Sequence, residues 1–478
     1  MKKIFYKIAF FTLIVGALTS CDKELDQVPF DSFGTENAYV TAADFENAIR
    51  GVYSNLTASG FYGGSDAGGM LDAPDVLSDN VVFAQKGRGT RRTLHNWQYG
   101  AADAPLNGLY TAAYSTIYRA NLLLANSEGF EGDNKENVVA EAKALRALAH
   151  FDLVTFWGKI PTQSSDANGS LGVAYVTEPD PTIEPARETV GRTYELIVQD
   201  LTDAAAGINE TNDVGRMNRD AVNTLLSRVY LYMGEWQKAV DAANLVSTPV
   251  APRSDVVDVW TDSSRSGLLF YIPNELPVLG ISVGVTWSQG GLTNLIPEYV
   301  VSYDFYNSFA EDDIRKEAYT LQAANNADGL QFNAIKKLYG REGQSNGQVD
   351  IKILRAAEAY LNKAEAYFNL GNESAARTAL DAVRTKRYTT PPSGETGSAL
   401  RDAIRLERRF EFAFEYQRFF DLKRWGLPVE RDGFGDLADG TGTPSDQQSL
   451  PAGSNKFQLP IAQSSLDQNP NLVQNPGY

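Results

Sequence analysis

The chain has 478 residues and a formal net charge of −17, and 43% of its residues are hydrophobic. This length suits one large domain or two closely packed ones, and the hydrophobic fraction is enough for a sizeable core. The negative charge repels a phosphate backbone, so we expect no nucleic-acid partner. With one cysteine and two histidines, an internal disulfide and a three-histidine zinc site are excluded, and we expect neither a metal nor a cofactor.

The first residues have the order of a lipoprotein signal peptide, which we place at residues 1–20. A basic start is followed by an apolar stretch, residues 8–17, and by the tetrapeptide Leu18-Thr19-Ser20-Cys21. The stretch is shorter than the roughly 20 residues that span a bilayer. We expect cleavage before Cys21 and acylation of its thiol, followed by a polar tether, residues 21–35. A buried structural cysteine fits less well, because Cys21 lies between the apolar signal and the polar tether.

Apolar residues at helical spacing predict a mainly α-helical domain over residues 36–478. The expected helical stretches begin at residue 42 and continue at about 104–127, 134–157, 188–208, 218–246 and 352–385. The last two have the aromatic-plus-small pattern of tetratricopeptide-type hairpins, and Gly371 can turn the chain between two helices. Because the two units are far apart in the sequence, we expect a scaffold of helical hairpins and no regular solenoid.

Three inserts are expected to be rich in loops: residues 60–100, 248–300 and 426–460. The second insert contains two apolar runs, 268–272 and 281–287, that we interpret as short strands. Long loops in a compact protein are usually functional or disordered. The second insert carries aromatic residues and is the better functional candidate.

Glu407, Glu411 and Glu415 are four residues apart and share one helical face. A glycosidase needs two carboxylates, one of them protonated. Arginines at positions 405, 408, 409 and 418 favour the ionised form instead, so we expect structural ion pairs at these glutamates. No nucleophile motif and no phosphate-binding motif is convincing, and we predict that the protein is not an enzyme.

Aromatic residues beside amides form the candidate ligand site. Sugars present apolar C–H faces that stack on aromatic rings, and their hydroxyl groups need polar partners. Trp287 lies in a Gly/Ser-rich segment near Gln289 and Asn294, and Trp97 has similar neighbours. We add Tyr62, Asp66 and Tyr271 from the loop-rich inserts. For each tryptophan, a place in the core remains the alternative.

Five motifs in order resemble the SusD/RagB family of outer-membrane lipoproteins of the Bacteroidetes. They are Cys21-Asp22-Lys23-Glu24-Leu25-Asp26, Phe156-Trp157-Gly158-Lys159-Ile160-Pro161, Leu354-Arg355-Ala356-Ala357-Glu358-Ala359-Tyr360, Glu407-Arg408-Arg409 with Arg418-Phe419-Phe420-Asp421-Leu422, and the closing Gln468-Asn469-Pro470-Asn471-Leu472-Val473-Gln474-Asn475-Pro476-Gly477-Tyr478. They are spread from end to end of the chain. The resemblance implies four tetratricopeptide-like hairpins and a loop-rich face, with ligand contacts from variable loops at about 60–100 and 271–296.

The resemblance also implies a cell-surface protein, anchored in the outer membrane by its lipid and facing the exterior. It would capture oligosaccharides and deliver them to a SusC-like TonB-dependent transporter. A peptide-capturing RagB-like role is the alternative within the family, and a secreted hydrolase is the alternative outside it. A tryptophan beside amides favours sugar over peptide, and we find no carboxylate pair that suits a hydrolase.

Overall fold

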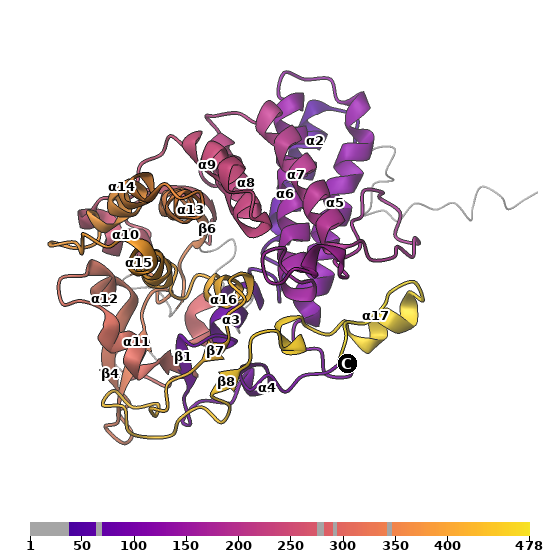
Figure 1. Cartoon of the computed structure of the whole chain (residues 1–478). Coiled ribbons are helices and arrows are strands. Elements are labelled where there is room, and N and C mark those ends of the chain that lie inside the picture. The colour runs from indigo at the N-terminus through magenta and orange to yellow at the C-terminus, as the bar shows by residue number, and fades with distance from the viewer. Residues whose placement is uncertain (1–37, 64–68, 275–281, 290–293, 342–346) are drawn as a thin grey trace, which may run out of the picture.

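The computed structural model describes residues 38–63, 69–274, 282–289, 294–341 and 347–478, and most of its regular structure is helical (Figure 1). The longer helices are α2 (Ala42–Asn55), α3 (Gly69–Val76), α5 (Asn107–Asn126), α6 (Lys135–Trp157), α7 (Val190–Gly207), α8 (Arg219–Met233), α9 (Trp236–Asn244), α13 (Ala356–Asn369), α14 (Glu373–Arg384) and α15 (Gly397–Glu411). The shorter ones are α4 (Arg92–His95), α10 (Val256–Trp260), α11 (Tyr303–Ser308), α12 (Ile314–Tyr319), α16 (Arg418–Arg424) and α17 (Gln463–Gln468).

Consecutive long helices pack as hairpins, as the periodicity predicts. α5 packs on α6, α6 on α7, α8 on α9 and α13 on α14, and α9 and α15 both contact α13. Gly234 ends α8 with a φ of +75°, and Gly371 follows α13 with a φ of +77°; both lie in the left-handed region that favours glycine. The prediction for Gly371 as a turn residue is therefore confirmed.

The strands form four two-stranded antiparallel sheets within the described part of the chain, and these lie mostly among the loops (Figure 1). The pairs are β1 (Val81–Phe83) with β3 (Tyr299–Val301), β2 (Leu268–Ile272) with β6 (Ile351–Arg355), β4 (Thr320–Ala324) with β5 (Gln331–Ile335), and β7 (Val429–Glu430) with β8 (Ser449–Leu450). The predicted strand at 268–272 is confirmed.

Two sequence-based assignments are wrong. Residues 283–286 form a short 3₁₀ helix, not a strand, and residues 275–281 lie outside the described residues. The helical hairpin predicted from residue 352 begins with β6, because Leu354 pairs with Phe270 of β2 before α13 starts at Ala356. A run of five residues with three apolar side chains, two of them isoleucines, suits both a strand and a buried helix, so periodicity alone cannot separate them.

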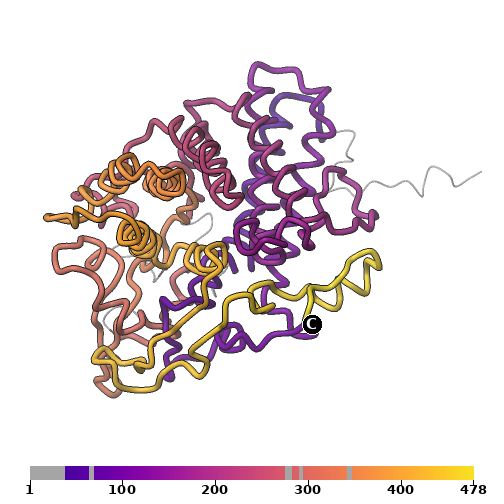
Figure 2. The backbone as a smooth tube through the Cα atoms, in the orientation of Figure 1, coloured from indigo at the N-terminus to yellow at the C-terminus, as the bar shows by residue number. Residues whose placement is uncertain are grey.

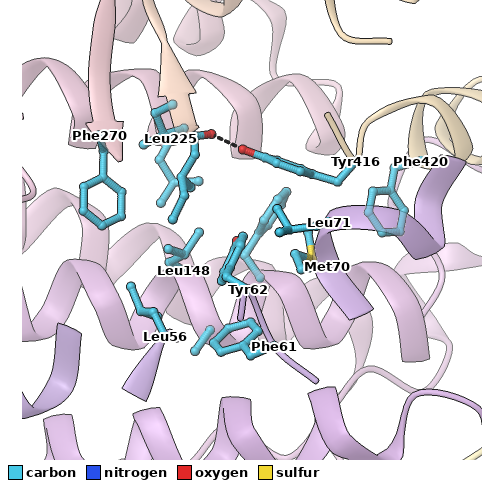
Figure 3. Close-up of a cluster of buried hydrophobic side chains, with 14 of the residues drawn as sticks. Leu56, Phe61, Tyr62, Met70, Leu71, Leu148, Leu225, Phe270, Tyr416 and Phe420 are labelled. Atoms are coloured by element: carbon cyan, nitrogen blue, oxygen red, sulfur yellow. Dashed lines mark hydrogen bonds between the residues drawn. The ribbon is translucent and has the colours of Figure 1, made fainter. Parts of the chain in front are cut away.

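The main hydrophobic core extends along most of the chain, from Phe45 in α2 to Ile461 near the C-terminus. Figure 3 shows part of it, where Tyr62 and Met70 meet side chains of α6, α8 and the segment before α16. Tyr416 packs edge-on against Tyr62 at 6.2 Å, and its hydroxyl donates to the Lys352 carbonyl at 3.0 Å. The core thus joins the helical hairpins to the loop-rich part.

The glutamates of α15 and the turn after it are buried and paired, as predicted. Arg387 Nε lies 2.8 Å from Glu411 Oε2, and Arg355 Nη1 lies 2.8 Å from Glu411 Oε1. Arg355 also binds Glu415, with Nε 2.7 Å from Oε2. Burial alone would raise the pKa of Glu411, but Arg387 and Arg355 hold that pKa well below its ordinary value. This carboxylate therefore stays ionised and is unsuited to act as a general acid.

The arginines that pair with these glutamates are not the sequence neighbours that the pattern suggested. Arg315 from α12 and Arg384 from α14 bind Glu407, whereas Arg408 binds Asp421 of α16. The long-range pairs connect four elements that the sequence separates by up to about 100 residues.

Removing one buried carboxylate from this network should destabilise the fold strongly. Glu411→Ala leaves three buried guanidinium groups without a shared acceptor, so we expect a loss of about 3–5 kcal/mol in the free energy of unfolding. Urea unfolding followed by circular dichroism measures it. Glu311→Ala is the matched control, because the Glu311 side chain is 92% exposed and its ion pair is with Lys316 at the surface. A loss at Glu411 as small as that of the control would show that the network does not hold the fold together.

Asp152 of α6 is a second buried carboxylate, and it has a weaker set of partners. Its Oδ2 accepts a 2.8 Å hydrogen bond from the Tyr62 hydroxyl, and its Oδ1 has no hydrogen-bond partner among the described residues. Burial raises the pKa of Asp152 to about 7, although Tyr62 and Arg228 act to lower it. The folded state binds the Asp152 proton more tightly than the unfolded state does. The contribution of Asp152 to the free energy of unfolding is therefore fully present below pH 3.8 and is lost as the pH rises towards 7.

Asp152→Asn should therefore stabilise the protein in a pH-dependent way. We expect a gain of about 1–3 kcal/mol at pH 8, where the buried carboxylate is charged, and little change at pH 4. Urea unfolding at pH 4, 6 and 8 gives the difference, with the exposed Asp133→Asn as control. A gain that does not grow between pH 4 and pH 8 would contradict this assignment.

Candidate functional site

Trp287 lies in the core and does not form an open platform. Its side chain is 2% exposed, and its ring packs edge-on against Tyr299 at 6.3 Å and Phe414 at 6.0 Å. A Cβ on Gly284 would lie 2.2 Å from the Leu338 carbonyl oxygen, so that glycine permits close packing. The small residues beside Trp287 thus serve burial, and the predicted stacking role of Trp287 is corrected to a core role.

The two amides predicted beside Trp287 lie at the edge of the same region. Gln289 is half-buried and donates from Nε2 to Glu298 Oε1 at 2.5 Å. Asn294 is exposed, and its Oδ1 accepts from the Asn326 N–H at 3.1 Å. The residues between them, 290–293, lie outside the described residues. Gln289 and Asn294 therefore support local structure, and neither faces Trp287 across an open surface.

Trp97 is also enclosed. It has a φ of +54°, its Nε1 donates to the Leu77 carbonyl at 3.1 Å, and the Arg431 guanidinium lies 4.1 Å from its ring centroid. Its side chain is buried, so the predicted ligand role is corrected here as well. The guanidinium of Arg431 occupies the ring face that a sugar would need.

The remaining predicted residues are dispersed. Tyr62 is buried on Asp152, and Tyr271 is buried in β2 with the Arg265 guanidinium 4.5 Å from its ring centroid. Asp66 and the lipidation candidate Cys21 lie outside the described residues. The structure therefore does not gather the predicted residues into one open site. In the described ranges, no group of three or more His, Cys, Asp or Glu side chains is placed to hold a metal ion.

An open aromatic surface is found instead on α5. Tyr110, Tyr114 and Tyr118 are four residues apart, so they form a row along one face of this helix, and all three are half-buried. They line a groove of about 300 Å³. Its other described walls are Ile117, Ala174, Val176, Glu178, Asp180, Pro181, Ile183, Pro185, Asn469 and Leu472. We call it the tyrosine groove.

Packing fixes the inner part of the tyrosine row. The rings of Tyr110 and Tyr114 are 4.9 Å apart, and Tyr110 packs edge-on against Trp157 at 5.1 Å. The Tyr114 hydroxyl donates to the Ala174 carbonyl at 3.0 Å. Burial raises the pKa of both tyrosines, so both hydroxyl groups are protonated at neutral pH. The rings are thus held in place before any ligand arrives.

The charge of the tyrosine groove is negative. Glu178 and Asp180 are exposed at its wall, and the lining residues that the structure describes include neither lysine nor arginine. The hydrogen bonds from Thr182 lower the pKa of Asp180, so this carboxylate is ionised. A groove of this kind favours a neutral ligand with apolar faces and repels an anionic one.

A second, more polar hollow of about 410 Å³ borders the same segments. Its walls include the amides Asn455, Gln458 and Asn475 and the ion pair of Lys159 with Asp166. We call it the amide groove. Amide groups both donate and accept hydrogen bonds, as hydroxyl-rich ligands require.

The C-terminal segment joins the two grooves. Asn469 donates from Nδ2 to the Pro185 carbonyl at 3.0 Å beside the tyrosine groove, and Asn475 donates to the Trp157 carbonyl at 2.8 Å beside the amide groove. Between them, Arg187 Nη1 donates to the Val473 carbonyl at 2.8 Å. Figure 2 shows this segment, in yellow, beside the purple chain that leads into α5. Gln463 N donates to the Ala101 carbonyl there, at 3.0 Å.

Comparison with known proteins gives the same family from both halves of the chain. A family model described as "SusD family" matches residues 332–478, and one described as "Starch-binding associating with outer membrane" matches residues 33–231. The chain is 26% identical to SusD-like protein P2 from Formosa agariphila, with 100% of both chains covered.

Solved structures agree with the family models. A SusD superfamily protein from Bacteroides thetaiotaomicron is 28% identical with a TM-score of 0.80, covering 91% of this chain and 100% of that one. Another, from Bacteroides vulgatus, is 27% identical with a TM-score of 0.79, covering 92% and 100%. With its helical hairpins and these matches over residues 33–231 and 332–478, the chain belongs to the SusD family.

Proposed function

We propose that this protein is a lipid-anchored glycan-binding protein of the outer cell surface. It captures oligosaccharides and delivers them to a SusC-like TonB-dependent transporter, and it acts as a single domain without catalysing a reaction. The family supports the carbohydrate ligand and the association with the outer membrane. None of the helices in the described ranges is long and apolar enough to cross a membrane.

The tyrosine groove is the observation that carries the proposal. Three rings four residues apart offer a row of apolar faces, and the acidic wall disfavours anionic polymers. Consecutive sugar rings of a neutral oligosaccharide present the matching apolar faces. The amide groove beside it offers partners for hydroxyl groups of a longer chain. We therefore expect neutral oligosaccharides as the ligand class.

The double variant Tyr110→Ala/Tyr118→Ala tests this site. Each lost ring removes roughly 1.4 kcal/mol of stacking and burial, so we expect the affinity for a neutral oligosaccharide to fall about 10- to 100-fold. Tyr114 is left in place because its hydroxyl binds the α6–α7 connection. Isothermal titration calorimetry with starch, laminarin, mannan, xylan and acidic polysaccharide fragments measures the change.

The matched control is Tyr230→Ala, which removes an equally half-buried ring from α8. If the double variant binds as tightly as the wild type, the tyrosine groove is not the site. If the wild type binds none of the glycans, the proposed carbohydrate function itself is contradicted.

Cys21→Ala tests the anchor. Without the thiol no acyl chain can be attached, so we expect the protein to move from the membrane fraction to the soluble fraction and to lose labelling by an alkyne-tagged palmitate. Substituting Ser20 by alanine keeps a small residue before the cysteine and should change neither readout. Membrane retention of Cys21→Ala at wild-type level would contradict lipid anchoring at this residue.

A further inference from the structure

A pocket of opposite charge lies between the helical hairpins. It encloses about 200 Å³ and shares no lining residue with either groove. Its walls come from α9, α13, α15 and the end of α16, at the other side of the helical row from α5 (Figure 1). The lining residues are Thr162, Trp236, Glu365, Phe368, Asn369, Arg401, Ile404, Arg405, Arg424 and Trp425.

The charge of this pocket is positive in a chain of net charge −17. Three arginines line it and one carboxylate faces them, that of Glu365. This carboxylate is already bound: Arg424 Nη2 lies 2.6 Å from its Oε2, and Trp425 Nε1 donates to its Oε1 at 2.8 Å. Arg401 pairs with Asp402 at the exposed rim.

Arg405 is the arginine of this pocket whose charge is not paired with a carboxylate among the described residues. Among the described residues it makes no ion pair and no side-chain hydrogen bond, and its guanidinium lies 4.8 Å from the Trp425 ring centroid. A guanidinium that stacks on an indole uses its flat face, so its N–H donors stay directed outward in its own plane. Burial lowers the pKa of Arg405, and Glu365 only partly offsets this because Arg401 and Arg424 also act to lower it. An anion in the pocket would relieve that unfavourable environment.

The pocket also has an aromatic wall, on which the apolar face of a ligand ring can pack. Trp236 is the first residue of α9, placed by the turn at Gly234, and it is half-buried. Together with Phe368 it gives the pocket an apolar part beside the arginines that line it. A volume of about 200 Å³ is below the range of about 300–1,000 Å³ for drug-sized ligands, so it suits one ring and not a chain.

We propose that this pocket binds one ring of an acidic sugar, in which a carboxylate or sulfate group meets Arg405 and the ring face meets Trp236. Carboxylated and sulfated sugars have in common an anionic group on a pyranose ring. A planar guanidinium matches both groups through paired N–H donors. The site is independent of the tyrosine groove and extends the ligand range from neutral glycans to acidic ones.

The test is calorimetric titration of the mature full-length protein in detergent with digalacturonate, galactose 6-sulfate and the neutral disaccharide galactobiose. We expect the wild type to bind at least one anionic probe, and added NaCl to weaken that binding. Arg405→Gln should lower the affinity for it at least tenfold. Arg405→Lys keeps the charge but loses the paired donors, so its loss should be smaller. Which anionic probe binds separates a carboxylate from a sulfate ligand.

Three further variants make the result specific. Trp236→Ala should weaken the same probe several-fold, which provides a second measurement if Arg405→Gln does not fold. Arg192→Gln removes an exposed arginine from α7 and should change nothing. Tyr110→Ala/Tyr118→Ala should leave the anionic probe unaffected, so failure of one site is distinguishable from failure of the other.

Two outcomes would overturn the proposal. One is equal affinity of the wild type and Arg405→Gln for the anionic probes. The other is an absence of binding of the wild type to any anionic probe. If Arg405→Gln then also weakens association with the transporter, the pocket belongs to a carboxylate of a protein partner.

Discussion

The structure depends on a buried network of ion pairs centred on α15, the turn after it and α16. Glu411 connects this part to β6 through Arg355 and to the end of α14 through Arg387. One helical turn away, Asp421 and Arg408 connect α16 back to α15. Desolvating these charges costs free energy that their pairing recovers only when every partner is present. The network therefore favours one arrangement of helices and loops over other compact ones.

The same network explains why the loop-rich part has a fixed position on the helical scaffold. Asp79 follows α3 and accepts from Arg418 at 2.7 Å, and Arg409 of α15 donates to the Asp79 carbonyl at 2.9 Å. Burial opposes ionisation of Asp79, but the two arginines lower its pKa below the ordinary range. The segment that leads from α3 to β1 is thereby fixed to α15 and α16. The proposed tyrosine groove lies instead on the helical scaffold, along α5.

Most of the long helices could be predicted from the sequence, whereas the burial of loop residues could not. Periodicity located α5, α6 and α7 within a few residues, because an amphipathic pattern reflects which face meets the core. A tryptophan among glycines and amides has no such pattern, because this composition suits both an open loop and a loop packed closely against another backbone. Trp287 lies in a closely packed loop. The tyrosines of α5 carried a usable signal, since their spacing of four within a predicted helix places three rings on one face.

The tyrosine groove and the arginine-lined pocket differ in charge, and the arginines of α15 explain the difference. Arg401, Arg405 and Arg409 are four apart, yet only the outer and inner members find carboxylates, Asp402 at the rim and Asp79 in the interior. The acids that act on Arg405 are Glu365 and Asp402, and these already bind Arg424 and Arg401. Both acids are paired within the fold, so Arg405 remains as a cation at the pocket. The described walls of the tyrosine groove, in contrast, carry two carboxylates and no cation. An acidic chain can in this way hold sites for neutral and for anionic sugars on separate faces of one scaffold.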